Sequence, residues 1–163
     1  MRNRRIKNIG GFTMLEMMIV IVIIGVFASM AAPSFMNWIP KMKLKADARE
    51  KVNYLRQARN LAISENCQFG VFFDVANNQI VYFKDTASPE LAMYNEGADS
   101  LLKAPIPCVS TAYMDNCSFT NSTVVFYSNG SASTSGTIEL LNNSSSDSYT
   151  INVLASTGRI RLQ

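Results

Sequence analysis

The longest apolar stretch of the chain lies near its beginning. Residues 12–32 are apolar apart from Thr13, Glu16 and Ser29. A run of about 20 apolar residues is long enough to cross the hydrocarbon core of a bilayer as one helix. A basic segment without acidic residues precedes it, which favours a cytoplasmic N-terminus. The pattern predicts a membrane helix, in which the carboxylate of Glu16 needs an explanation because a charge in a membrane segment is costly.

The pattern that follows is that of an amphipathic helix over residues 46–66. Apolar side chains recur there every three or four residues and predict one buried stripe. The stripe consists of Leu44, Ala48, Val52, Leu55, Ala58 and Ala62. The basic side chains of this helix are interpreted as a solvated face: Arg49, Lys51, Arg56 and Arg59. A single helix from Phe12 to about Asn66 would be about 80 Å long.

After Cys67 the pattern changes to the two-residue period of strands. Residues 69–75 and 79–85 predict a hairpin. Four later stretches predict further strands: residues 123–128, 137–142, 148–156 and 158–163. Asn129-Gly130 separates the first two of these and is a strong hairpin signal.

Residues 85–115 are expected to be irregular, because they contain Pro89, Gly97, Pro105 and Pro107. The predicted fold class is α+β, with a long N-terminal helix packed on a C-terminal antiparallel sheet. The expected division is a basic leader (1–11), an apolar helix (12–40) and an amphipathic helix with a strand-rich head (41–163).

Charge and composition argue against several functions. The net charge of +3 comes from the leader, since the chain from Phe12 onward has eleven basic and twelve acidic residues. Net charge therefore gives no support for nucleic-acid binding. The chain has no histidine, the commonest general base and metal ligand. We expect no enzyme activity, no catalytic residue, no cofactor and no metal. Asp74, Asn77 and Asn78 offer oxygen atoms suited to calcium, but a hairpin turn explains them better.

The residues around Glu16 resemble the N-terminus of type IV pilin-like proteins. The shared pattern is a basic leader that ends in Gly11, followed by Phe12-Thr-x-x-Glu16 and an apolar helix. The resemblance implies cleavage by a prepilin peptidase between Gly11 and Phe12, and methylation of the new N-terminus. It also implies that Glu16 pairs with the N-terminal amine of a neighbouring subunit during filament assembly. A secretory signal peptide fits less well, because its apolar core is shorter and no clean cleavage site follows.

The same resemblance implies that Gly25 and Pro33 weaken the apolar helix. Pro33 removes a backbone donor and is expected to kink or melt the helix, and Pro40 is expected to add a second bend. The strand-rich head and the ending Gly158-Arg159-Ile160-Arg161 resemble the GspH/FimT group of minor pilins and pseudopilins.

The expected function is therefore that of a minor pilin or pseudopilin, a structural subunit of a type IV pilus or a type II secretion system that assembles after prepilin peptidase cleavage. Its expected location is the bacterial inner membrane, as a single-pass protein, and then a periplasmic or extracellular filament. Expected partners are other pilin or pseudopilin subunits, the prepilin peptidase and the inner membrane. In an oxidising compartment we predict a disulfide between Cys108 and Cys117, stabilising by about 2–4 kcal/mol. Cys67 is then either a buried thiol or part of an alternative pair.

The C-terminal Arg159 and Arg161 have two interpretations. In the first, they are the solvated face of an edge strand whose Ile160 and Leu162 point inward, and their charge discourages aggregation. In the second, Gly-Arg-x-Arg resembles a motif associated with DNA capture by FimT-like minor pilins, which makes DNA a possible partner. Two guanidiniums on one face suit neighbouring phosphates.

Overall fold

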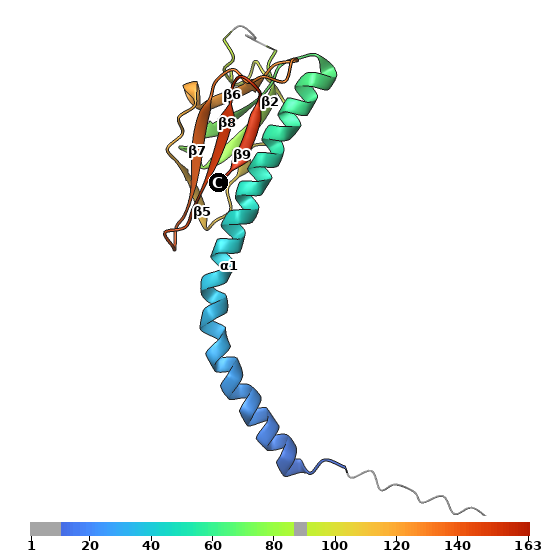
Figure 1. Ribbon diagram of the computed structural model, residues 1–163, viewed down its shortest axis with the longest axis vertical. Helices are drawn as coiled ribbons and strands as arrows, with labels where there is room; N and C mark the ends of the chain where they lie inside the picture. Colours follow the sequence, from blue (N-terminus) through green and yellow to red (C-terminus); the bar gives the residue numbers. More distant parts are fainter. Residues whose placement is uncertain (1–10, 87–90) are drawn as a thin grey trace, which may run out of the picture. The chain divides into compact units, whose positions relative to one another are not determined.

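A computed structural model of the chain describes residues 11–86 and 91–163 (Figure 1). The chain divides into two compact units, Met1–Trp38 and Ile39–Gln163. One helix, α1 (Met14–Glu65, 52 residues), contributes to both units, as the sequence predicted. The strands all belong to the second unit, and the fold class is α+β as expected.

In the first unit, the described side chains of α1 are exposed and mostly apolar. The helix continues through Gly25, Pro33 and Pro40, so Pro33 does not melt it. The predicted kinks at Pro33 and Pro40 stay predictions. Within the described residues, no helix meets the combined length and apolarity required of a membrane span.

In the second unit, the predicted helical stripe is confirmed. All six of its apolar residues are buried, none more than 4% exposed. They pack in one core with apolar residues from the strands, including Phe69, Phe126, Ile138 and Ile151. The period of three and four therefore identified the face of α1 on which the head is built.

The strands of the described residues form two antiparallel sheets. The first has the order β3-β2-β1-β6, and β4 also pairs with β2. Its strands are β1 (Phe69–Asp74), β2 (Gln79–Lys84), β3 (Ser100–Leu101), β4 (Ile106–Pro107) and β6 (Thr123–Phe126). The second sheet has the order β5-β7-β8-β9. Its strands are β5 (Ala112–Asp115), β7 (Gly136–Asn142), β8 (Ser148–Leu154) and β9 (Arg159–Leu162). A short 3₁₀ helix, η1 (Thr120–Ser122), precedes β6.

The predicted hairpin of β1 and β2 is confirmed, with Asp74 opposite Gln79 at the turn. The hairpin signal at Asn129-Gly130 was wrong about its partners, because β6 lies in the first sheet and β7 in the second. The turn returns the chain only as far as an isolated bridge between Phe126 and Ala132. Beyond it, the chain crosses to the other sheet.

Residues 85–115 were expected to be irregular, and residues 87–90 of this stretch lie outside the described residues. The remainder holds three short strands, β3, β4 and β5. Each takes hydrogen bonds from a longer neighbour, β2 or β7, which is how such short segments remain extended.

Candidate functional site

The start of α1 carries a helix cap that sequence reasoning missed. Thr13 directly precedes the helix, and its Oγ1 accepts a hydrogen bond from the backbone N–H of Glu16 at 3.2 Å. This is the bond by which an N-cap residue satisfies the third residue of a helix, and Thr-x-x-Glu is the spacing of a capping box. The spacing therefore predicts the helix start, and the cap is formed by the Thr13 side chain with the backbone of Glu16.

The carboxylate of Glu16 remains available for another partner. The residue is exposed, and no hydrogen bond or ion pair of its side chain is recorded within the described part of the chain. A negative charge in the first turn also suits the positive end of the helix dipole. Exposed apolar side chains surround it, among them Phe12 at 77% and Met14 at 85% exposure.

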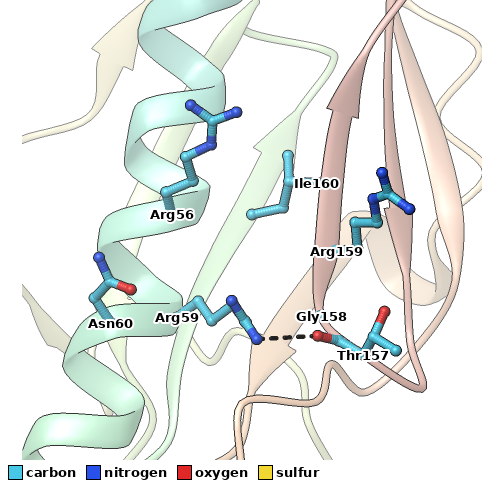
Figure 2. A pocket seen from close by; sticks show the side chains of 7 residues that line it. All are labelled: Arg56, Arg59, Asn60, Thr157, Gly158, Arg159 and Ile160. Carbon is cyan, nitrogen blue, oxygen red and sulfur yellow. Dashed lines mark hydrogen bonds between the residues drawn. The ribbon is translucent and has the colours of Figure 1, made fainter.

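A second candidate site is a basic groove in the second unit, about 460 Å³ in volume, between α1 and the start of β9 (Figure 2). Its lining comes from both elements: Arg56, Arg59, Asn60, Thr157, Gly158, Arg159 and Ile160. We call it the α1–β9 groove. It joins Arg159, which the sequence singled out, to two helix arginines that the sequence placed on a solvated face.

Arg59 holds one end of the α1–β9 groove together. Its Nε donates to the carbonyl oxygen of Gly130 at 2.9 Å, and its Nη2 donates to that of Thr157 at 3.1 Å, the bond dashed in Figure 2. The solvated-face interpretation is thus wrong for Arg59, which is half-buried. Sequence spacing could not reveal this, because both acceptors are backbone atoms from distant turns.

Gly158 lets the β8–β9 turn approach this arginine. Its φ of +59° is in the left-handed region, and a Cβ there would lie 2.1 Å from the carbonyl oxygen of Gly130. A side chain at this position would separate the turn from Gly130 and Arg59, so the glycine is needed for the close approach.

The remaining arginines at this end of the head are exposed. Arg56, Arg159 and Arg161 have no recorded ion pair with any described residue. Arg159 and Arg161 also border a smaller groove of about 250 Å³ on the other side of β9, with Asn152, Leu154 and Gln163. Arg159 therefore faces both grooves, Arg56 only the larger one and Arg161 only the smaller one.

The alternation predicted for β9 is confirmed. Arg159 and Arg161 are exposed, whereas Ile160 and Leu162 are half-buried and pack against the core.

Lys51 is the clearest exception to the solvated face. It is 1% exposed, and its Nζ donates to Asp47 Oδ1 at 2.8 Å. The two residues are four apart on α1, the spacing that brings side chains together on a helix. Asp47 Oδ1 also accepts from the backbone N–H of Val109 at 3.4 Å, which ties the ion pair to the strand-rich part of the head.

The predicted disulfide between Cys108 and Cys117 is absent: both are free thiols, as is Cys67. Strand β5 lies between them, and an extended strand of four residues advances the chain by about 13 Å. A disulfide needs its Cα atoms within about 7 Å, so the strand opposes the short loop that sequence spacing suggested. Burial raises the pKa of Cys108 to about 11, although Lys51 acts in the opposite direction. The thiol is therefore protonated at neutral pH.

The oxygen cluster at Asp74 is a turn, as the sequence favoured. Its Oδ1 accepts from the backbone N–H of Asn77 at 3.1 Å, and its Oδ2 accepts from the Asn77 and Gln79 side chains. Burial acts to raise the pKa of Asp74, but these hydrogen bonds outweigh it and lower the pKa. Asn78 has a left-handed backbone conformation, and its side-chain amide forms hydrogen bonds with the backbone of β5. Within the described residues, no three potential ligands are grouped to hold a metal ion.

Comparison with known families decides the affiliation of the chain. Residues 47–157 match the family described as type II transport protein GspH. The chain belongs to the GspH family. Residues 6–32 also match the prokaryotic N-terminal methylation motif, a range that includes Gly11, Phe12 and Glu16.

Solved structures similar to this GspH-family chain share its fold. One is the minor pseudopilin EpsH from the type 2 secretion system of Vibrio cholerae, with 15% identity, a TM-score of 0.60, and coverage of 74% of this chain and 96% of that one. Another is the type IV minor pilin FimU of Pseudomonas aeruginosa PAO1, with 19% identity, a TM-score of 0.56, and coverage of 76% and 90%. The resemblance to pilins and pseudopilins is thus confirmed.

A sequence relative is the type IV major pilin protein PilA of Myxococcus xanthus strain DK1622. It is 27% identical over 106 residues, which cover 61% of this chain. The GspH-family chain spans about half of that relative, 48% of its length.

Proposed function

We propose that the protein is a minor subunit of a filament of the type IV pilus or type II secretion class, and that it assembles through its apolar N-terminal helix. The observation that carries the proposal is the row of exposed apolar side chains from Phe12 to Met30, interrupted by the single carboxylate of Glu16. A surface this apolar needs an apolar partner. Copies of the same helix, packed in a bundle, provide one.

In this proposal the prepilin peptidase removes residues 1–11 and leaves Phe12 as the N-terminus, which is then methylated. A terminal amine is mostly protonated at neutral pH and supplies the cation that Glu16 needs in an apolar bundle. Each subunit brings one amine and one carboxylate, so the contact is head-to-tail and propagates along a filament. The match of residues 6–32 to the methylation motif supports this route.

Before assembly, the apolar segment would hold the subunit in the inner membrane, with the basic leader on the cytoplasmic side. Its composition supports this stage, since residues 12–32 contain one charged residue. After assembly, the head (residues 41–163) would face the periplasm or the exterior. Gly25 and Pro33 would then give the helix the local freedom to repack from bilayer to bundle.

The test of this proposal is the mass of the protein in filaments isolated from cells that make it. The expected chain begins at methylated Phe12. The matched variant Gly11→Val is expected to retain residues 1–11 and to stay in the membrane fraction. Filaments that contain the chain with residues 1–11 still attached would contradict the proposal.

A second candidate function is DNA capture through Arg159 and Arg161. The favouring observation is that both guanidiniums are exposed on one face of β9, border one small groove, and have no recorded ion pair with a described residue. Two such groups can contact neighbouring phosphates. The near balance of charge from Phe12 onward means that any binding depends on this local cluster.

We test DNA capture with duplex DNA and the full chain in detergent micelles, across a salt series. Binding should weaken as salt rises, and Arg161→Gln should reduce the slope of log K against log salt by about 1, the share of one phosphate contact. Lys43→Gln removes an exposed charge elsewhere on α1 and should leave the slope unchanged. Absence of binding at low salt would exclude this function.

A further inference from the structure

Strand β9 forms an open edge of the second sheet. Among the described residues it pairs with β8 alone, and β8 lies between β9 and β7. An open edge presents backbone N–H and C=O groups that another strand can pair with.

The hydrogen bonds to β8 show which backbone groups of β9 face outward. Gln163 and Thr150 exchange both of their backbone hydrogen bonds, each at 2.9 Å. Hydrogen-bonded and non-bonded pairs alternate along an antiparallel ladder. Arg161 and Arg159 therefore also bond to β8, whereas Ile160 turns its N–H and C=O toward the open edge. Leu162, two residues further, does the same.

The α1–β9 groove lies beside this edge. Ile160 is part of its lining and extends from β9 toward α1, with Arg56 on the opposite wall (Figure 2). Arg59 directs its Nε and Nη2 to Gly130 and Thr157, so it braces the end of the groove. The free backbone groups of Ile160 thus border a groove, and a ligand there meets both a donor and an acceptor.

The charges along the edge select the kind of strand that can add to it. Pairing β9 with β9 of another copy would oppose arginines, and like charges directly opposite each other on a sheet are destabilising. Acidic side chains on the face of Arg159 and Arg161 would instead form cross-strand ion pairs. Apolar side chains on the other face would join Ile160 and Leu162, which already pack against the core.

We propose that β9 and the α1–β9 groove bind an extended segment of a neighbouring filament subunit, in which acidic and apolar residues alternate, and that this segment adds to the second sheet as a strand. The inference rests on the proposed filament function and names the partner of the head. A peptide suits this edge better than DNA does, because Ile160 offers both a donor and an acceptor while phosphate oxygens only accept. Backbone bonds would supply affinity, and the arginines would select the charge.

The test uses the full chain in detergent micelles and a synthetic seven-residue peptide of alternating Glu and Val. We expect saturable binding, and slowed amide hydrogen exchange at Ile160 and Leu162 when the peptide is bound. Arg159→Gln and Arg56→Gln should each weaken binding about two- to fivefold, the effect of an exposed ion pair. Lys43→Gln should leave the affinity unchanged.

Two control peptides separate strand addition from simple attraction of charge. The first has the same Glu and Val residues with alternate backbone nitrogens methylated, and it should not bind because its donors are lost. The second replaces Glu with Lys and should also fail. Equal binding of the methylated peptide, or unchanged exchange at Ile160, would overturn the proposal.

Duplex DNA serves as a competitor in the same experiment. DNA binds at the smaller groove if it displaces the peptide and this displacement is lost in Arg161→Gln but kept in Arg56→Gln. That result supports the strand site beside it. Absence of peptide binding at millimolar concentration would overturn the strand site. It would leave the filament function intact, because that function is read separately from the N-terminus of the protein in filaments.

Discussion

At the scale of single residues, burial and backbone contacts separated charged side chains that look alike in the sequence. The helical pattern places Lys51, Arg56 and Arg59 together on the polar face of α1. In the structure, Lys51 is buried, Arg59 is half-buried and Arg56 is exposed. The apolar stripe was predictable because its burial follows from helical spacing. The burial of Lys51 was not predictable, since the segment at Cys108 and Val109 that contacts the Asp47–Lys51 pair is distant in the sequence.

Loss of Lys51 is expected to destabilise the head strongly. Lys51→Met leaves Asp47 buried without its cation, at a cost of about 3–5 kcal/mol in the free energy of unfolding. Asp47 and Lys51 are 2% and 1% exposed at their side chains, so solvent does not screen the pair. Urea unfolding of the full chain in detergent, followed by circular dichroism, measures the loss.

Two further variants make that result interpretable. The double variant Lys51→Met/Asp47→Leu should recover most of the lost stability, because apolar residues of similar size often replace a buried ion pair without loss. Lys43→Met, at an exposed position, should change stability by less than about 0.5 kcal/mol. A double variant as unstable as Lys51→Met would show that packing, and not the uncompensated charge, sets the cost.

At the scale of elements, local signals predicted strands well and their partners less well. The alternation in residues 69–85 predicted the β1–β2 hairpin, whose strands are neighbours in the sequence and in the sheet. Asn129-Gly130 is a turn with Gly130 at a φ of +81°, but its flanking strands separate into different sheets. A turn signal specifies the local reversal of the chain, whereas the sheet each strand joins is decided by distant residues.

The β8–β9 turn yields a prediction at this scale. Gly158→Ala should destabilise the head by more than about 2 kcal/mol, because it combines a left-handed backbone with a Cβ placed 2.1 Å from Gly130 O. Gly97→Ala is the matched control, since its φ is +78° but no atom lies within 4 Å of the added Cβ. It should cost about 1 kcal/mol. Equal losses in thermal unfolding would mean that the close approach to Gly130 adds nothing.

At the scale of the whole molecule, the two candidate sites differ in how far the sequence reveals them. The assembly segment is contiguous, so Gly11, Phe12 and Glu16 could be recognised from their order along the chain. The α1–β9 groove joins residues about a hundred positions apart, such as Arg56 and Arg159. The sequence identified only the C-terminal arginine as a candidate binding residue. The disulfide prediction was wrong for a related reason, since sequence spacing could not show that a strand separates Cys108 from Cys117.

In the proposed assembly, the carboxylate charge of Glu16 drives incorporation of the subunit into filaments. The cap uses the backbone N–H of residue 16, so Glu16→Gln and Glu16→Ala both keep this hydrogen bond and remove the charge, and Glu16→Gln also keeps the size of the side chain. The measurement is the amount of each variant in isolated filaments, relative to its amount in membranes. We expect both variants to be reduced at least about tenfold, because a buried amine without its carboxylate is strongly unfavourable. Incorporation of Glu16→Gln at the wild-type level would contradict the account, because the carboxylate charge would then not be needed for assembly.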